Sequence, residues 1–395
     1  MRTLTDQDFS NRRAVIRVDF NVPLDEQLNV TDSTRIMAAK ETITHILQKG
    51  GSCVLLSHLG RPKGKTPELS LMNILNNVEE VLGIPVAFCP DCIGPEAEKA
   101  AANLPPGSVL LMENLRFYEE ETSGDIEFAK ALAQLGDCYV NEAFGTAHRA
   151  HASTTIIAQF FKEDKFFGKL LEKEVNAIDK VMKTGEKPVL AILGGAKVSS
   201  KITIIENMLD KIDHLIIGGG MVYTFIKAQG GSVGRSICED DYCDYALELL
   251  EKAKAKGVAV HLPTDVIIAD GFSNEANKKS CKVHEIPHDW EGLDAGPETL
   301  KSFEKIVKAS KTILWNGPLG VFEMENFAKG TITLGEHIAN STAAGAFSLV
   351  GGGDSVAAVK QFGFEDRMSY ISTGGGAMLE SLEGKTLPGI AALLD

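Results

Sequence analysis

Short apolar runs alternate with helical stretches along the whole sequence. Each run is rich in β-branched residues, ends in a turn that carries glycine, asparagine or aspartate, and is followed by apolar residues at helical spacing. This alternation is typical of parallel strands joined by crossover helices, so it predicts the α/β class. The runs predicted as strands are Ala14–Val18, Cys53–Ser57, Val86–Cys89, Ser108–Met112 and Cys138–Val140 in the N-terminal half, and Val189–Leu193, His214–Ile217, Val258–Leu262, Thr312–Trp315, Phe347–Val350 and Tyr370–Ser372 in the C-terminal half.

One helical stretch separates the two sets of strands. Residues 169–183 have helical apolar spacing without a breaker, and the glycine and proline of residues 184–188 end the helix. A chain of 395 residues also exceeds what one hydrophobic core usually organises. We therefore expect two Rossmann-like domains, residues 1–168 and 185–378. Each is predicted to be a parallel sheet flanked by helices, and a linker helix at residues 169–184 is expected to join them across a cleft.

Charge and cysteine usage exclude several classes of partner and site. The net charge of -14 and the isoelectric point near 5.2 argue against nucleic acid or an anionic membrane as the main partner. The first ten residues lack a signal-peptide core, and no run reaches the roughly 18 apolar residues of a membrane span. Seven cysteines without a secretion signal favour reduced thiols in the cytoplasm. Cys89 and Cys92 form a Cys-x-x-Cys pair, but without a second pair or a thioredoxin-like context we interpret them as ordinary thiols.

Cations gather in the loops that follow the N-terminal strands, where a parallel sheet binds its ligands. Arginine grips phosphate and carboxylate groups bidentately, so several arginines at such positions indicate a ligand with more than one anionic group. Arg35 joins them from a helix start that Asp32 or Ser33 is expected to cap. The loop residues are Asp19, Phe20 and Asn21, then His58, Leu59, Gly60 and Arg61, then Arg116, and finally Arg149 between His148 and His151.

Alternative interpretations of these loop residues stay open. Each arginine could be solvated and paired with a nearby acid such as Glu113 or Glu119, although the whole set at equivalent positions favours a ligand site. Asp19 and Asn21 could shape a turn, or they could accept hydrogen bonds from a substrate hydroxyl. His58 taken alone is more typical of a satisfied loop histidine than of a ligand-binding one.

The loops after the C-terminal strands are rich in glycine instead. The chain has 38 glycines, about a tenth of its residues, against roughly 7% in an average protein. Glycine lets the backbone approach a ligand closely, and N–H groups at helix starts attract phosphate. One such turn is a weak signal, and neither the strict P-loop pattern nor the dinucleotide fingerprint occurs. Five turns in one domain nevertheless favour a nucleotide: Gly194–Lys197, Gly218–Met221, Asn316–Gly320, Gly351–Ser355 and Gly374–Gly376.

Four charged residues in these loops are candidates for nucleotide contacts. Lys197 and Lys201 are spaced to share one face at the start of a helix, where they oppose the helix dipole unless an anion lies between them. Asp354 has two roles that can coexist, the N-cap of a helix beginning at Ser355 and a carboxylate for Mg²⁺ that accompanies nucleotide phosphates. Glu323 could bind a ribose hydroxyl or simply face solvent.

The ordered motifs resemble those of the phosphoglycerate kinase family over essentially the whole chain. That family transfers a phosphoryl group reversibly from 1,3-bisphosphoglycerate to ADP, which gives 3-phosphoglycerate and ATP, with Mg²⁺. The resemblance implies a monomeric, cytoplasmic enzyme of glycolysis whose two domains close about a hinge, with a C-terminal tail, residues 379–395, that returns to the N-terminal domain. The motifs are RVDFNVP, SHLGRPKG, ENLRFYEEE, EAFGTAHRAHAS, ILGGAKVSSKI, IIGGGM, WNGPLGVFE, GGGDS, STGGGA and EGKTLPG.

The resemblance also implies roles for individual residues. The substrate-binding positions are Asp19, Phe20, Asn21, Arg35, His58, Leu59, Gly60, Arg61, Arg116 and Arg149. The nucleotide-binding positions are Lys197, Lys201, Gly292, Glu323, Gly352, Gly353, Asp354 and Ser355, with Asp354 at the metal. Arg35 and Lys197, with the helix start at Gly374, Gly375 and Gly376, are expected to stabilise the transferring group.

One position departs from the family pattern. Members usually carry an aspartate between the two lysines, where this chain has Ser200. No domain-closing or metal-adjacent role is therefore implied for residue 200, but we expect activity to persist because both lysines and Asp354 remain. Two other classes are possible: an oxidoreductase that binds a dinucleotide, and a catalytically silent binding module. The missing fingerprint and the dispersed arginines count against the first, and the presence of every expected cation counts against the second.

Overall fold

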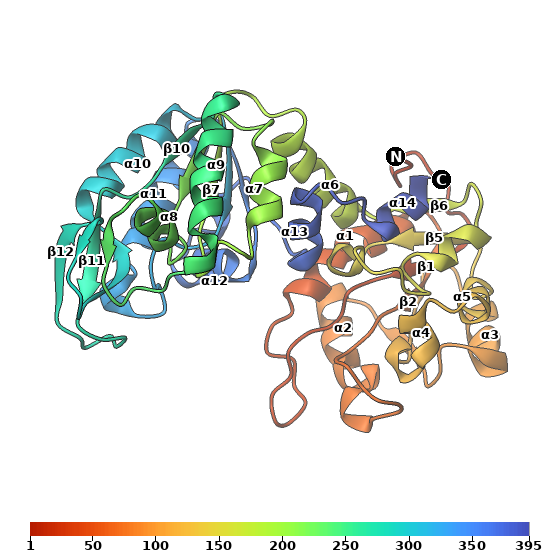
Figure 1. Cartoon of the computed structure of the whole chain (residues 1–395). Coiled ribbons are helices and arrows are strands. Elements are labelled where there is room, and N and C mark those ends of the chain that lie inside the picture. The colour runs from red at the N-terminus through yellow and green to blue at the C-terminus, as the bar shows by residue number, and fades with distance from the viewer. Residues whose placement is uncertain (395) are drawn as a thin grey trace. The chain divides into compact units, whose positions relative to one another are not determined.

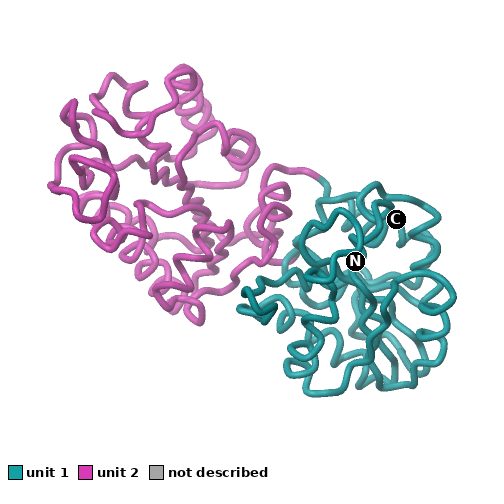
Figure 2. Tube along the Cα trace, turned by 90° about the horizontal axis from the view of Figure 1, so that it is seen from below, with its two compact units in different colours: residues 1–175, 386–395 teal, residues 176–385 magenta. Residues whose placement is uncertain are grey.

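The computed structural model describes residues 1–394, and the chain divides into two compact units. Unit 1 comprises Met1–Val175 and the C-terminal residues from Thr386, and unit 2 comprises Asn176–Lys385 (Figure 2). Helix α6 (Lys169–Met182) begins in unit 1 and ends in unit 2. The chain therefore passes between the units twice, first within α6 and again before Thr386.

These limits differ from the domain limits expected from the sequence. The helix expected at residues 169–184 is present as α6, but it is shared by the two units. The return to unit 1 begins at Thr386 and not at residue 379, because helix α13 (Gly376–Leu382) is held within unit 2, where Asn207 Nδ2 donates to the Leu382 carbonyl at 2.6 Å. The last tail residue, Asp395, lies outside the described residues. The assignment of one ligand to each domain stays a prediction.

Unit 1 is built on a six-stranded parallel sheet with the strand order β3-β4-β2-β1-β5-β6. Figure 1 labels β2, β1, β5 and β6 of this sheet. The strands are β1 (Arg13–Arg17), β2 (Ser52–Leu56), β3 (Val86–Cys89), β4 (Val109–Met112), β5 (Cys138–Asn141) and β6 (Lys165–Phe167). The helices are α1 (Thr34–Gln48), α2 (Leu75–Leu82), α3 (Gly94–Ala102), α4 (Glu119–Ser123), α5 (Ile126–Ala133) and α14 (Pro388–Leu394). The five strands predicted for this half are confirmed to within one residue at each end, whereas the three-residue β6 was not predicted.

Alternating residues of β1 face the two sides of this sheet. Ala14 and Ile16 pack with Ile36 and Ile43 of α1 in one hydrophobic cluster. Because side chains alternate along a strand, Arg17 points to the opposite side, where it is fully buried. The core thus places a guanidinium inside unit 1, directly below the loops that follow the strands.

Unit 2 contains a second six-stranded parallel sheet, with the order β10-β8-β7-β15-β16-β17. The strands are β7 (Val189–Leu193), β8 (His214–Ile217), β10 (Ala259–His261), β15 (Thr312–Asn316), β16 (Phe347–Val350) and β17 (Tyr370–Ile371). The helices, besides α13, are α7 (Ile202–Met208), α8 (Val222–Ala228), α9 (Cys243–Ala255), α10 (Pro297–Ala309), α11 (Lys329–Ala343) and α12 (Gly353–Gln361). All six strands of this sheet were predicted to within one residue.

A three-stranded antiparallel sheet in unit 2 was not predicted. Its order is β12-β11-β14, from β11 (Asp265–Ala269), β12 (Lys278–Lys282) and β14 (Glu291–Ala295). A short parallel pair, β9 (Ser232–Val233) with β13 (Glu285–Ile286), forms a separate two-stranded sheet. The sequences KKSCK and EGLDA of β12 and β14 contain no apolar run, so nothing in their pattern marks them as strands.

Two further observations bear on the expected lack of membrane spans and on the Cys-x-x-Cys pair. None of the helices in residues 1–394 combines the length and the apolar composition needed to cross a membrane. Cys89 and Cys92 are free, buried thiols, and burial raises the pKa of both.

Candidate functional site

The predicted cationic loops of unit 1 lie along one edge of its sheet. Strands β4, β2, β1 and β5 are neighbours in the sheet, so the loops after their carboxyl ends adjoin one another. These loops carry Arg116, His58, Asp19 and Arg149, respectively. Arg35 reaches the same edge from the first turn of α1. The structure thus brings the arginines and His58 to one place, as the sequence predicted.

Hydrogen bonds fix these loops to one another. Asn21 Oδ1 accepts from the Gly60 N–H at 2.8 Å, and Arg116 Nη1 donates to the Gly60 carbonyl at 2.8 Å. Arg35 Nη1 donates to the two carboxylate oxygens of Asp19 at 3.1 and 3.0 Å. Asp19 and Asn21 therefore position Arg35 and Gly60, whatever further contact they make with a ligand. Phe20 and Leu59 pack in the hydrophobic core of unit 1, so only their backbone is available to a ligand.

Most of the arginine charge is not neutralised by nearby acids. Glu113, one candidate partner, instead accepts from Ser70 Oγ at 2.6 Å and from the Leu71 N–H at 2.9 Å. Arg61 and Arg149 are exposed, and neither forms an ion pair with a carboxylate of residues 1–394. The interpretation of each arginine as half of a surface ion pair thus holds only for Arg35, which pairs with Asp19.

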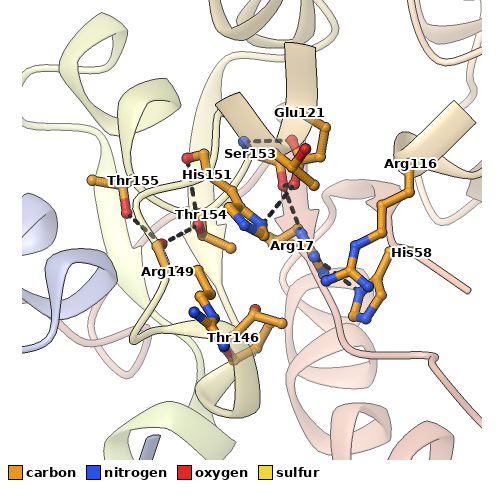
Figure 3. A network of polar contacts seen from close by, with 12 residues as sticks. Arg17, His58, Arg116, Glu121, Thr146, Arg149, His151, Ser153, Thr154 and Thr155 are labelled. Carbon is orange, nitrogen blue, oxygen red and sulfur yellow. Dashed lines mark hydrogen bonds and ion pairs between the residues drawn. The ribbon is translucent and has the colours of Figure 1, made fainter. Parts of the chain in front are cut away.

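A buried network that the sequence analysis missed supports these residues (Figure 3). Arg17 Nε donates to Ser153 Oγ at 2.7 Å, and Ser153 Oγ donates in turn to Glu121 Oε1 at 2.6 Å. The Ser153 N–H donates to Glu121 Oε2 at 3.0 Å. Arg17 and Glu121 are both fully buried, and the Ser153 hydroxyl links these two opposite charges. The sequence did contain one sign of this network, because an arginine within an apolar strand needs a buried partner for its charge.

Arg17 also sets the tautomer of His58. Its Nη2 lies 3.1 Å from His58 Nδ1. A guanidinium can only donate hydrogen bonds, so Nδ1 is the acceptor and the ring proton lies on Nε2. Burial, followed by the charge of Arg17, lowers the pKa of His58 well below its usual value. His58 is therefore a neutral ring that can donate from Nε2 to a ligand oxygen.

His151 and Arg116, which lie beside Arg17, each have a side-chain nitrogen without a hydrogen-bond partner in the described part of the chain. Burial, followed by Arg17, lowers the pKa of His151 to about 4 and lowers that of Arg116 as well. Arg116 Nε and His151 Nδ1 are buried atoms without a hydrogen-bond partner in the described part of the chain, and His151 Nδ1 is 3.9 Å from Glu121 Oε1. Since buried polar atoms are nearly always hydrogen-bonded, the unpartnered Arg116 Nε could donate to an oxygen of a ligand, whereas His151 Nδ1 faces the Glu121 carboxylate.

Glycine in unit 2 allows backbone segments to approach more closely than side chains permit. A Cβ at Gly194 would lie 2.2 Å from the Pro318 carbonyl oxygen. Gly219 has φ of +65°, and a Cβ there would lie 2.7 Å from the Gly195 nitrogen. The loops after β7, β8 and β15 are thus packed against each other through bare backbone. The glycine-rich pattern therefore has a structural cause in addition to any ligand.

A cavity of about 420 Å³ opens beside these loops. Three residues that the resemblance implied line it, namely Gly292, Glu323 and Asp354. The apolar wall of this cavity was not predicted, because part of it comes from the antiparallel sheet, which was not predicted either. The apolar lining residues that were not predicted are Tyr223, Ile237, Phe272, Leu293 and Val321. The combination of apolar walls with glycine backbone and the three carboxylates of Glu291, Glu323 and Asp354 suits a base, a sugar and phosphates.

The two lysines do not lie as predicted. Helix α7 begins at Ile202 with Lys201 as its N-cap, so Lys197 lies in the preceding turn and the two lysines share no helical face. Lys197 is exposed, whereas Lys201 Nζ donates to Asn316 Oδ1. Burial lowers the pKa of Lys201, and the nearby Asp354 opposes that shift. Ser200 is exposed and its hydroxyl donates to the Lys197 carbonyl at 2.8 Å.

The start of α12 also differs from the prediction. The helix begins at Gly353 with Gly352 as its N-cap, so Asp354 is not the N-cap but an exposed residue of the first turn. Ser355 Oγ accepts from the Gly317 N–H at 2.6 Å and thereby ties this loop to the one after β15. No group of three histidine, cysteine or acidic side chains within residues 1–394 could hold a metal ion, so Asp354 would have to share one with other ligands.

The final glycine turn forms the start of α13. Gly375 is its N-cap and has φ of +48°, and the helix begins at Gly376. A Cβ on Gly375 would meet no atom within 4 Å, so only the backbone conformation requires glycine there. Gly374 N donates to Ser372 Oγ at 3.1 Å.

Comparison with known proteins gives the same family throughout. The model of the family described as phosphoglycerate kinase matches residues 4–385. A phosphoglycerate kinase of Porphyromonas gingivalis is 52% identical over 99% of this chain and 99% of its own length, and a cytosolic one of Nicotiana tabacum is 52% identical over 100% and 98%. The solved structure of the phosphoglycerate kinase of Coxiella burnetii is 40% identical, with a TM-score of 0.91 over 99% of this chain and 98% of that one.

Proposed function

The chain belongs to the phosphoglycerate kinase family, and from that premise we propose how its two units divide the reaction. It is a phosphotransferase of glycolysis that acts on phosphoglycerates with ADP and ATP as co-substrates. We propose that the arginine cluster of unit 1 holds the phosphoglycerate and that the glycine loops of unit 2 hold the nucleotide.

The observation that carries the first half of the proposal is the uncompensated charge in unit 1. A phosphoglycerate has anionic groups at both ends, and several arginines can each bind one of them bidentately. Arg61 and Arg149 are exposed without ion pairs to described carboxylates, and Arg116 Nε is buried without a partner there. In this proposal Asp19 and Asn21 keep Arg35 and Gly60 in place. His58 donates from Nε2 to the bound anion.

The cavity of unit 2 supports the second half. Phe272, Ile237 and Val321 offer an apolar slot for a base, and Glu323 lies in the same lining for a ribose hydroxyl. Gly292 brings bare backbone to the wall, since a Cβ there would lie 2.0 Å from Tyr223 Oη. The phosphates then extend toward the lysines and the start of α12. That position is assigned to Lys197, Lys201, Gly352, Gly353 and Ser355.

Asp354 is the residue we propose for Mg²⁺. Mg²⁺ is often bound by one or two carboxylates together with substrate phosphates and water, which fits a single exposed carboxylate at a phosphate-binding helix start. The ion supplies positive charge to the nucleotide phosphates when bound. Lys201 is close enough to Asp354 for the carboxylate to act on the pKa of the lysine, so both charges belong to one local group.

The reaction needs charge stabilisation and positioning more than acid or base chemistry. In the direction of ATP synthesis, an oxygen of the ADP β-phosphate attacks the phosphorus of the acyl phosphate, and the bond to the carboxyl oxygen breaks. The leaving carboxylate is ionised at neutral pH, so it needs no general acid. We assign Arg35, Lys197 and the N–H groups at Gly374, Gly375 and Gly376 to the charge on the transferring group.

Transfer between a ligand of unit 1 and a ligand of unit 2 also requires the reacting atoms to meet in line. We propose that the units close during the reaction cycle, which orients the two ligands and excludes water. The ends of α6, the helix that both units share, are the proposed hinge positions.

A coupled assay of ATP formation from ADP and 1,3-bisphosphoglycerate tests the proposal. The wild-type protein should form ATP only with Mg²⁺, and Arg35→Ala should lower kcat at least about a hundredfold, in the range measured when a charge-stabilising donor is removed. Arg13→Ala is the matched control, because Arg13 lies on β1 and pairs with Asp137 at 3.0 Å, outside the proposed site. Wild-type activity without Mg²⁺, or full activity of Arg35→Ala, would contradict these assignments.

Family membership also supports a proposal on location and assembly. Relatives from Nicotiana tabacum and Triticum aestivum carry the description cytosolic. We propose a cytoplasmic monomer whose partners are small molecules, without a nucleic acid or membrane partner.

A further inference from the structure

A second cavity in unit 2, distinct from the proposed nucleotide cavity, is lined by three lysines. Its volume is about 260 Å³. It lies among the antiparallel sheet, the first turn of α10 and the start of α11. We call it the lysine cavity, and it is defined by Ile267, Lys278, Lys279, Ser280, Asp294, Ala295, Pro297, Leu300, Asn326 and Lys329.

None of the three lysines is neutralised by an ion pair within residues 1–394. Lys278 Nζ donates to the Asn326 side chain at 2.6 Å, which is an uncharged partner. Lys279 Nζ lies 4.1 Å from the centre of the Trp290 ring, and Lys329 has no ion pair with a described carboxylate. Lys282, on the same strand as Lys278 but outside the cavity, does pair with Glu298, at 2.9 Å. The lysines without ion pairs are thus the ones that line the hollow.

Asp294 is the acid in the lining of the lysine cavity, and both of its carboxylate oxygens already accept hydrogen bonds from the backbone. Asp294 is 2% exposed; its Oδ2 accepts from the Gly330 N–H at 2.7 Å and its Oδ1 from the Ala295 N–H at 2.8 Å. Burial raises the pKa of Asp294 to about 7, although Lys278 and Lys329 oppose that rise. The lining therefore retains a net positive charge whether or not Asp294 is ionised.

The rest of the lining determines which anions fit. Ile267, Ala295, Pro297 and Leu300 give the cavity an apolar side. A free inorganic ion cannot use that side, whereas a small organic molecule with one charged end can. We propose that the lysine cavity binds a small amphipathic anion, a compound with a phosphate or carboxylate head and a short apolar body.

The cavity is separate from the proposed nucleotide site but shares a wall with it. On β14, Gly292 and Leu293 line the larger cavity while Asp294 and Ala295 line the smaller one. A Cβ at Gly320, which lines the larger cavity, would lie 2.2 Å from Asp294 Oδ1. Saturating ADP in an experiment therefore fills the first cavity and leaves the second available.

A simpler explanation accounts for only part of the pattern. Strand β12 is an edge strand of its sheet, and lysines on edge strands prevent pairing with other chains. That explanation covers Lys278, Lys279 and Lys282 equally, but it explains neither Lys329, which begins α11, nor the hollow that it faces. The experiment below separates the two explanations, because the edge-strand explanation predicts no difference between Lys282 and the others.

Tryptophan fluorescence gives a direct readout of binding. The chain has two tryptophans, Trp290 and the fully buried Trp315, and both lie in unit 2. Phenyl phosphate is the probe, with inorganic phosphate as the head alone and phenol as the body alone, all titrated with saturating ADP. We expect phenyl phosphate to produce a saturable change and to bind at least tenfold more tightly than either fragment. In Trp290→Phe the fluorescence change should disappear, because the indole ring next to Lys279 is the group that reports binding.

Variants locate the site without relying on turnover. Lys278→Gln combined with Lys329→Gln should raise the Kd of phenyl phosphate at least tenfold, while Lys282→Gln should leave it unchanged within twofold. All three side chains are exposed, so equal melting temperatures verify that the fold is retained. Equal Kd values in the double variant and the control, equal binding of inorganic phosphate, or displacement of the probe by ADP would each overturn the proposal. Because no step measures phosphoryl transfer, failure here leaves the proposed kinase activity unaffected.

Discussion

The two units present charge at their proposed ligand sites in opposite ways. Unit 1 uses side chains: Asp19 holds Arg35, the Gly60 carbonyl holds Arg116, and the buried network of Arg17, Ser153 and Glu121 holds His58. Unit 2 uses backbone, because its glycine loops lie against each other at distances that no Cβ permits. Positive side chains suit a compact polyanion, whereas exposed N–H groups with an apolar wall suit an extended nucleotide. The same strand–loop–helix plan thus supports both kinds of recognition.

The buried network of unit 1 should produce the largest effect when it is broken. Arg17→Met removes a fully buried cation and leaves Glu121 buried without its compensating charge. Breaking buried charge pairs in this way typically costs about 3–5 kcal/mol of unfolding free energy. Urea unfolding followed by circular dichroism measures the loss.

The control for that variant is Arg13→Met, which removes a partly exposed arginine from the same strand. Exposed pairs contribute roughly 0–1 kcal/mol, so its unfolding midpoint should stay close to that of the wild type. Equal losses in the two variants would mean that the buried network is not what stabilises the site of unit 1.

Glycine substitutions in unit 2 should separate structural glycines from those that face a ligand. Gly194→Ala places a Cβ 2.2 Å from a backbone oxygen, and overpacking of this kind typically costs about 1–3 kcal/mol. Gly353→Ala places its Cβ where no atom lies within 4 Å, so stability should hardly change. Its affinity for ADP should nevertheless fall about tenfold, because the new methyl group stands at the proposed phosphate position.

Calorimetric melting and ADP titration of both variants check these expectations. A stable Gly194→Ala protein would contradict the close loop packing. Undiminished ADP affinity in Gly353→Ala would remove the start of α12 from the nucleotide site.

A buried carboxylate directly after β5 makes the stability of unit 1 depend on pH. Burial raises the pKa of Glu142 to about 7, although the Leu170 and Leu171 N–H groups that it accepts from partly oppose the rise. The folded protein therefore holds this proton more tightly than the unfolded chain, whose glutamate titrates near 4.3. Its favourable contribution is complete below about pH 4 and is lost as the pH rises through 7.

Glu142→Gln removes that titration. Relative to the wild type, the variant should gain up to about 3 kcal/mol of unfolding free energy between pH 4 and pH 8, on top of any constant loss from the altered hydrogen bonds. Urea unfolding at several pH values measures the difference. A difference independent of pH would show that Glu142 is ionised in the folded protein.

The smallest effect is expected at the position that departs from the family pattern. Ser200 is exposed and donates only to the Lys197 carbonyl, so Ser200→Asp adds a solvated charge near the proposed phosphate position. Screening by water and salt limits its influence, and we expect kcat/KM to change less than about threefold. Steady-state kinetics at two salt concentrations tests this. A change of tenfold or more would place residue 200 in the transition-state environment.

The sequence predicted the parallel sheets and the location of the cationic loops because both depend on local pattern. Strand ends such as those of β3 and β7 follow directly from apolar runs between turns. Arg35 and Arg116 were found because several arginines fall together at strand and helix ends, where the whole set favours a ligand site. The resemblance to the family then implied Gly292, which neither a local pattern nor a quoted motif marks.

Other features depend on tertiary context and could not be predicted in this way. Strand β14 reads EGLDA, and only its pairing with β11 makes it a strand and a wall of the nucleotide cavity. Lys197 fell outside the expected helix because the turn at residues 197–201 continues to Lys201 before α7 begins. Arg17 lay inside a quoted motif, yet its role depends on Ser153 and Glu121, far along the chain.

Isothermal titration calorimetry tests the division between the units most directly. Both 3-phosphoglycerate and ADP are titrated into each of two variants, Arg149→Ala and Gly353→Ala. Arg149→Ala should weaken 3-phosphoglycerate binding at least about thirtyfold and leave ADP binding unchanged within twofold, since Arg149 is exposed and forms no ion pair with a described carboxylate. Gly353→Ala should do the reverse. If either variant weakens both ligands equally, or if Arg149→Ala still binds 3-phosphoglycerate like the wild type, the proposed division between side-chain and backbone recognition is wrong.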